Sequence, residues 1–155
     1  MTEAELANAD ALLDANIIVA ICCDPQDPRF ERLALMDEDG RSLLIRLLGS
    51  CKSLLTIPQA LAEASNLLGQ KAGRDLRLAR LRTLVTEVLE QFVPSRSAVA
   101  EDGYRYLGLT DAALLVAAGD RSRTLLTMDA LLHDSAARLG LKSVNFNHIR
   151  GRYLT

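Results

Sequence analysis

Short apolar runs alternate with longer segments of helical spacing along most of this chain. Brief runs rich in Leu, Val and Ile, bounded by polar residues, are typical of strands that are buried on both faces of a sheet. Four segments fit that description. We therefore predict strands at residues 10–14, 53–57, 124–127 and 142–146.

The segments between these runs repeat their apolar side chains every three to four residues, which predicts helices. Pro58 directly follows the second predicted strand, and proline suits the first turn of a helix. The insertion at residues 24–40 holds two prolines and is expected to form a loop with a short helix at 30–36. The other predicted helices are 15–23, 41–50, 58–69, 74–92, 97–106, 111–118 and 131–139.

Strands that alternate with helices predict an α/β fold, a three-layer α/β/α sandwich with a central, mostly parallel sheet. The length of 155 residues fits a single domain, 1–155. Helices 58–69 and 74–92 are expected to form an antiparallel pair across the turn at 69–73. Helix 74–92 carries a long apolar stripe, which suggests that the pair contributes to a homodimer. The stripe consists of Leu76, Leu81, Leu84, Val85, Val88 and Leu89.

Composition narrows the location and the partners. The chain is 49% hydrophobic and 25% charged, a globular profile, and no apolar run approaches the ~20 residues that span a bilayer. Three cysteines without paired spacing suggest reduced thiols, so we expect a cytoplasmic protein with no membrane association. A net charge of −2 gives no global attraction to nucleic acid, so an RNA-binding role requires local basic patches. Arg74, Arg121 and Arg123 are candidates for RNA contacts.

Four acids lie where apolar stretches begin, end or turn polar: Asp14, Glu63, Asp111 and Asp129. Burying a carboxylate in hydrocarbon is costly unless a cation shares the site, and a hard divalent cation offsets the repulsion between several carboxylates. With only two histidines, any metal is expected to have oxygen ligands. Taken singly, each acid also has a structural explanation. The three aspartates could cap helices, and Glu63 could be a surface residue.

The sequence around these acids resembles the PIN-domain ribonucleases. The resemblance lies in five blocks that occur in the order of the family and cover most of the chain between residues 11 and 147. The blocks are LLDANII (12–18), IPQALAEASN (57–66), LGLTDAA (107–113), TLLTMDALL (124–132) and VNFN (144–147).

This resemblance implies a PIN-like fold and Mg²⁺- or Mn²⁺-dependent hydrolysis of RNA phosphodiester bonds, with 5′-phosphate and 3′-hydroxyl products. Asp14, Glu63, Asp111 and Asp129 would be the catalytic, metal-binding tetrad. Asn16 and Thr127 would be polar supports near the metal. The small stand-alone bacterial members are mostly VapC-type toxins, so the resemblance also implies the toxin of a type II toxin–antitoxin pair with a cognate antitoxin as partner.

One rival interpretation fails on a single residue: a phosphotransferase of the haloacid-dehalogenase type needs a second aspartate two residues after the first, and Asn16 occupies that position. Two other interpretations stay open. A PIN nuclease that processes RNA outside any toxin system fits the same residues, and so does a non-catalytic PIN-like interaction domain, although such domains usually lack one of the acids. The 24–40 insertion makes the interval between Asp14 and Glu63 longer than in compact members of the family.

Overall fold

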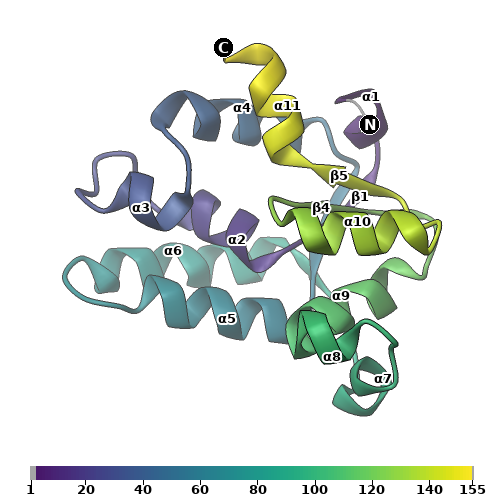
Figure 1. Cartoon of the computed structure of the whole chain (residues 1–155). Helices are drawn as coiled ribbons and strands as arrows, with labels where there is room; N and C mark the ends of the chain where they lie inside the picture. The colour runs from purple at the N-terminus through teal and green to yellow at the C-terminus, as the bar shows by residue number, and fades with distance from the viewer. Residues whose placement is uncertain (1–2, 155) are drawn as a thin grey trace.

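The computed structural model describes residues 3–154, and its core is a five-stranded sheet in which all strands are parallel (Figure 1). The spatial order is β3-β2-β1-β4-β5. The strands are β1 (Asp10–Leu13), β2 (Ser53–Thr56), β3 (Leu89–Glu90), β4 (Arg123–Thr127) and β5 (Ser143–Asn145). The sheet is therefore all-parallel rather than mostly parallel, as parallel strands linked through helices require.

Helices make every connection between the strands. In chain order, the helices up to β3 are α1 (Glu3–Leu6), which precedes the sheet, α2 (Ala15–Cys22), α3 (Phe30–Ala34), α4 (Glu38–Gly49), α5 (Pro58–Leu68) and α6 (Arg74–Glu87). The helices after β3 are α7 (Ser95–Val99), α8 (Tyr104–Leu107), α9 (Leu109–Ala118), α10 (Ala130–Arg138) and α11 (Phe146–Tyr153), which follows the last strand.

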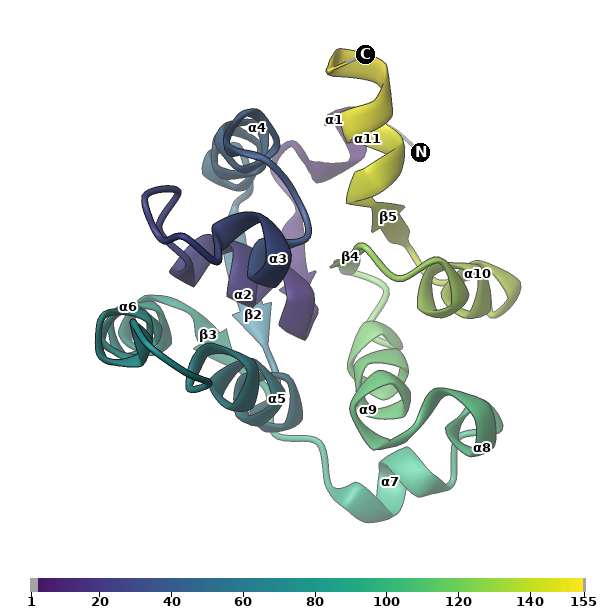
Figure 2. The same ribbon diagram turned by 60° about the vertical axis from the view of Figure 1, so that its left-hand side comes forward.

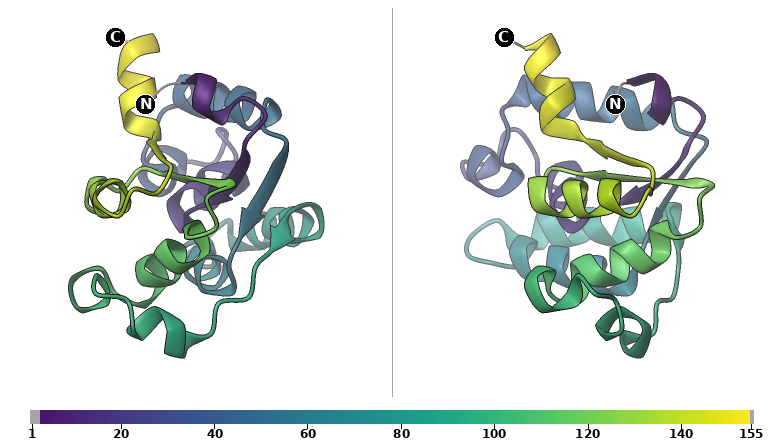
Figure 3. Two further views of the ribbon diagram at one scale, coloured as in Figure 1. Left: turned by 90° about the vertical axis from the view of Figure 1, so that its right-hand side faces the viewer. Right: turned by 45° about the vertical axis from the view of Figure 1, so that its right-hand side comes forward.

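The helices lie on both faces of the sheet, which gives the expected three-layer α/β/α arrangement. Figure 2 and the left view of Figure 3 show α4 and α11 on one side of the strands and α9 on the other. Helices α5 and α6 form the predicted antiparallel pair beside α2 (Figure 1). Within residues 3–154 we find no helix with the length and apolarity that crossing a bilayer requires.

The strand order reverses beside β1. The chain moves from β1 outward to β2 and β3, and then crosses back to place β4 on the other side of β1. Leu13 at the end of β1 is paired with Leu126 near the end of β4, so both strands end at the same edge of the sheet. In open α/β sheets, ligands bind beyond the carboxyl ends of the strands at such a switch point.

Two local predictions need correction, and two helices were not predicted. The helix predicted at 74–92 ends at Glu87, and the chain then forms the edge strand β3 beside β2. The helix predicted at 97–106 is two short helices, α7 and α8. The terminal helices α1 and α11 were not predicted, and each has few buried side chains, so each gives a weak apolar pattern.

The apolar stripe on the predicted helix 74–92 is also wrong in detail. Leu81 and Leu84 are buried, but Leu76 and Val85 are exposed. Nine residues separate Leu76 from Val85, which places them about 180° apart on a helix. They therefore lie on opposite flanks of α6, on either side of its buried face.

Candidate functional site

Asp14 lies at the switch point, between the last residue of β1 and the first of α2. Its Oδ1 accepts a hydrogen bond from the backbone N–H of Ala15 (2.6 Å), and its Oδ2 accepts one from the Thr127 hydroxyl (2.6 Å). Only 3% of the residue is exposed. Burial raises the pKa of Asp14 to about 6; the two hydrogen bonds oppose this rise, while the charges of Glu63 and Asp129 add to it.

Thr127 joins the ends of β1 and β4. Besides donating to Asp14, its oxygen accepts the backbone N–H of Asp129 (2.9 Å). Asp129 in turn caps α10, because its Oδ1 accepts from the N–H of Leu132 (3.0 Å). One buried hydroxyl therefore fixes the positions of two of the four acids relative to each other.

Asp111 lies in the first turn of α9, the helix that leads into β4. The pKa of Asp111 is raised to about 7, chiefly by burial and also by the charges of Asp14, Asp129 and Glu63. Glu63 lies on α5 and is exposed, yet its charge acts on both Asp14 and Asp111. The structure thus brings all four predicted acids into one electrostatic neighbourhood, and Figure 2 shows α2, α5, α9 and α10 around the ends of β1 and β4.

The capping explanation and the site explanation are compatible for two of the aspartates. Asp14 and Asp129 are N-caps of α2 and α10, as the simpler interpretation predicted. Asp111 is not a cap, because the N-cap of α9 is Gly108. Gly108 has a φ of 88°, a conformation that favours glycine. No capping bond therefore accounts for the half-buried carboxylate of Asp111.

The chemistry of these donors fits a hard divalent cation. The site offers carboxylate oxygens, the protein ligands that Mg²⁺ prefers. Two carboxyl groups with raised pKa values, held apart by mutual repulsion, would be stabilised in their charged form by a cation. Within residues 3–154, no three His, Cys, Asp or Glu side chains lie close enough together to coordinate one metal ion directly. Mg²⁺ keeps several waters, so it needs only one or two direct carboxylate ligands.

Two polar residues beside the acids were not singled out from the sequence. Thr56 ends β2 and donates its hydroxyl to the Leu13 carbonyl (2.9 Å), next to Asp14. Gln59 lies one helical turn before Glu63, and its amide nitrogen donates to the Val93 carbonyl (2.8 Å). The Gln59 Oε1 is buried and has no hydrogen-bond partner within the part of the chain that the structure describes. Thr56 is the last residue of an apolar strand, a position where threonine is too common to single it out.

Asn16 and Asn145 lie at the same edge of the sheet. Asn16 is half-buried in the first turn of α2, two residues after Asp14. Asn145 ends β5 opposite Thr127 and caps α11 through the N–H of Asn147 (2.9 Å). Uncharged polar groups thus continue the acidic edge onto β5.

The arginines predicted to contact RNA do not lie around the acids. Arg123 begins β4 and is paired with Asp10, the first residue of β1, so it lies at the edge of the sheet opposite to Asp14. It donates to the Ala117 carbonyl and to Gln91, and Arg121, two residues earlier, donates to the Gly140 carbonyl. Arg121 and Arg123 therefore lie away from the acids, and their contact with RNA stays a prediction. Arg74 is exposed at the start of α6, beyond the far end of α5.

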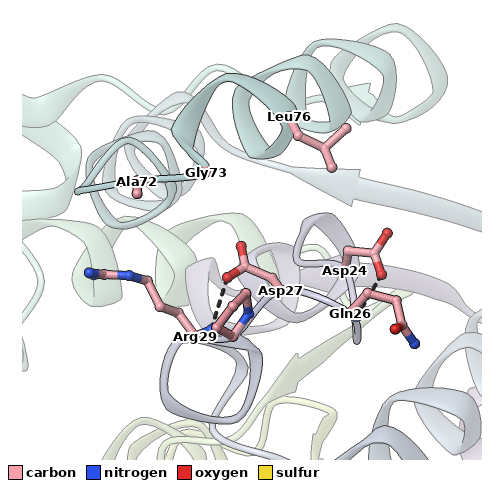
Figure 4. Close-up of a pocket in the computed structure, with 8 residues that line it drawn as sticks. Asp24, Gln26, Asp27, Arg29, Ala72, Gly73 and Leu76 are labelled. Atoms are coloured by element: carbon pink, nitrogen blue, oxygen red, sulfur yellow. Dashed lines mark hydrogen bonds between the residues drawn. The ribbon is translucent and has the colours of Figure 1, made fainter.

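The first part of the 24–40 insertion, loop 24–29, lies against α6. Loop 24–29 follows α2, at the opposite end of that helix from Asp14, and faces the start of α6 across a hollow of about 320 Å³ (Figure 4). Arg77 and Arg80 on α6 bind Asp27 and Asp24 of this loop, each at 2.6 Å. Loop 24–29 is therefore anchored away from the site.

Comparisons with known proteins leave the family open. No family model matches the chain, and no curated protein matches it. Among solved structures, the chain is similar to a domain of a functionally unknown protein from Methanocaldococcus jannaschii DSM 2661. The sequence identity is 20%, the match covers 88% of this chain and 90% of that chain, and the TM-score is 0.46.

Proposed function

We propose that this chain is a divalent-metal-dependent ribonuclease of the PIN-like type that hydrolyses RNA phosphodiester bonds. The observation that carries the proposal is that the charges of Glu63 and Asp129 act on both Asp14 and Asp111 at the switch point of a parallel sheet. The four acids come from four different connections between strands, so no single helix or loop explains why they lie near one another. A shared cation does explain it.

Mg²⁺ or Mn²⁺ bound there would lower the pKa of a water and offset negative charge on the scissile phosphate. The residues of the chain would supply position and charge. Asp14 and Asp111 would be the ligands most enclosed by protein, and Thr127 would hold the Asp14 carboxylate in one orientation through its 2.6 Å hydrogen bond. Asp129 would face the same space from the start of α10, and Glu63 would approach from α5.

The biological role that we propose is the toxin of a type II toxin–antitoxin pair, with a cognate antitoxin as protein partner. This part rests on the resemblance of the sequence blocks alone. A small gene for an antitoxin directly upstream would support it, and a genomic setting among RNA-processing genes would favour a maturation nuclease instead.

The test of the activity is cleavage of total cellular RNA in Mg²⁺, in Mn²⁺ and in chelator, with the cut sites mapped. Asp14→Asn and Asp111→Asn are expected to lower the rate by at least about 100-fold while the circular dichroism spectrum stays that of the wild type. Asp134→Asn, an exposed aspartate on α10, is the matched control and should cleave normally. Cleavage that persists in chelator, or in both site variants, would contradict the proposal.

A further inference from the structure

A shallow hollow lies at the start of α9. It has a volume of about 480 Å³. The residues that line it belong to α8, the glycine after it and the start of α9: Tyr104, Arg105, Tyr106, Leu107, Gly108 and Leu109. Asp111 follows two residues later in the first turn of α9, so the hollow and this one of the four acids share the start of a helix.

The side chains of α8 are not explained by the core. None of its four residues is buried, although two of them are aromatic. The chain has only three tyrosines, and Tyr104 and Tyr106 are both exposed here, with the exposed Arg105 between them. Clustered exposed aromatic side chains on a small protein mark an interaction surface more often than isolated ones do.

The position of α8 is fixed by its neighbours. The N–H of Gly108 donates to the Tyr104 carbonyl (2.9 Å), which closes α8, and α8 packs on α9. The aromatic and cationic side chains are therefore presented from a short, anchored element at the start of the helix that carries Asp111. Arg105 also supplies positive charge there, whereas Arg121 and Arg123 lie at the other edge of the sheet.

We propose that this hollow is a nucleotide subsite, in which Tyr104 or Tyr106 stacks on an unpaired base and Arg105 binds an adjacent phosphate. Tyrosine rings stack on any base of a single strand, and a guanidinium pairs with phosphate oxygens in a fixed geometry. The inference rests on the proposed function, because the acidic site is where the phosphodiester would lie. It adds that the substrate enters as a single strand with at least one base unstacked.

The test measures binding without cleavage. A fluorescein-labelled single-stranded RNA of mixed sequence is titrated with the full chain in chelator, and its anisotropy is followed; a DNA strand of the same sequence is run in parallel. We expect Tyr104→Ala or Tyr106→Ala to weaken binding about tenfold and the matching Phe variants to bind within about twofold of the wild type. Arg105→Ala should weaken binding and flatten its salt dependence.

Tyr153→Ala is the matched control, because Tyr153 and Tyr106 are each 53% exposed and Tyr153 lies on α11. Its affinity should equal that of the wild type. The chain has no tryptophan, so its emission comes from tyrosine, and stacking should quench that emission in Tyr153→Phe as much as in the wild type. Thermal melting of each variant checks that the exposed substitutions leave the fold intact.

Three outcomes would overturn the subsite: no binding of either strand, wild-type affinity in the tyrosine and arginine variants, or equal loss in Tyr153→Ala. Wild-type affinity in those variants would assign the hollow to another partner, such as a protein segment. The nuclease proposal fails separately. If the variants weaken binding but the wild type never cleaves RNA in Mg²⁺ or Mn²⁺, the subsite stands and the activity does not.

Discussion

At the scale of single residues, the Thr127 hydroxyl links two of the four acids through hydrogen bonds. It donates to Asp14 and accepts from the N–H of Asp129, and it is fully buried. Thr127→Val keeps the shape of the side chain but leaves a buried carboxylate oxygen and a backbone N–H without this partner. We expect unfolding by urea at pH 8 to become easier by about 1–3 kcal/mol.

Thr127→Ser is the control for this substitution, because it keeps the hydroxyl and loses only the methyl group. The valine variant should be the less stable of the two. The lost bond should also raise the pKa of Asp14 further above about 6, since the Thr127 bond now lowers it. A valine variant as stable as the serine variant would contradict the importance of the hydroxyl.

Asp111 predicts a dependence of stability on pH. Its pKa is 3.8 in the reference state and about 7 in the folded chain, so the folded state binds the proton more tightly. Between these values the native state carries more protons than the unfolded state, and the free energy of unfolding falls as the pH rises. Without metal, Asp111→Asn removes this cost. We expect it to stabilise the fold at pH 8 by on the order of 1 kcal/mol, after allowance for solvent screening, and to have little effect at pH 4.

The measurement is urea unfolding in chelator at both pH values. Asp134→Asn serves again as the exposed control and should show no such change between pH 4 and pH 8. Equal effects of Asp111→Asn at the two pH values would mean that its carboxyl group does not experience the burial and repulsion described above.

The acids were predictable from the sequence because each one interrupts an apolar run, and a charge in that position stands out. Thr127 was predictable only through the resemblance. Thr56 and Gln59 were not, because a threonine at the end of a strand and a glutamine in the first turn of a helix are common in every α/β protein. Their importance arises from the pairing of β1 with β2 and from the Val93 carbonyl, which are contacts between distant segments.

At the scale of elements, the α5–α6 turn is held by one buried arginine. Arg77 is 1% exposed, and it donates to the carbonyls of Leu68, Gln70 and Ala72 and to Asp27. Arg77→Met keeps much of the packing of the stem but leaves these acceptors without their donor. Breaking a buried ion pair by removing one partner costs about 3–5 kcal/mol, and we expect a loss of that size in urea unfolding.

Arg74→Met is the control, since Arg74 begins the same helix and is exposed. Arg74→Met should change the free energy of unfolding by no more than about 0.5 kcal/mol. Similar losses of stability in the two variants would show that the hydrogen bonds and the ion pair of Arg77 add nothing beyond ordinary surface packing. The regular spacing of Arg74, Arg77 and Arg80 gave no sign of this difference, because the acceptors of Arg77 lie in a turn and a loop whose positions depend on the fold.

Most helices and strands were predictable from the sequence, and β3 shows why one strand was not. β2 and β4 are apolar runs between clear boundaries, so their pattern is strong. β3 has two residues, both exposed, and directly follows α6, so its apolar Leu89 continued the helical pattern. Only the pairing of β3 with β2 makes it a strand, and that pairing is a contact between residues more than thirty positions apart.

At the scale of the whole molecule, the edge of the sheet at β3 exposes apolar side chains. Leu89 is exposed, and Phe92, three residues later, is 74% exposed, the largest value among the exposed large hydrophobic side chains of residues 3–154. Val85, at the end of α6, adds a third. The backbone of a strand at the edge of a sheet is also unpaired on its outer side.

We expect two copies of the chain to associate through this edge. The face is close to the one predicted from the sequence, but it is centred on β3 and Phe92 rather than on a stripe along the whole of α6. A stable dimer needs roughly 800 Å² buried on each partner, which is more than three side chains provide, so neighbouring surface of α6 would have to take part.

Light scattering at micromolar concentration tests this assembly. The wild type should have the mass of a dimer, and Phe92→Glu should shift it to the mass of a monomer, because a charge at the centre of an apolar contact has no partner there. Leu131→Glu is the control, since Leu131 is an exposed leucine on α10, a helix that flanks β4 and β5 rather than β3. A monomeric wild type would refute the dimer, and a monomer caused equally by Leu131→Glu would place the interface at another face of the sheet.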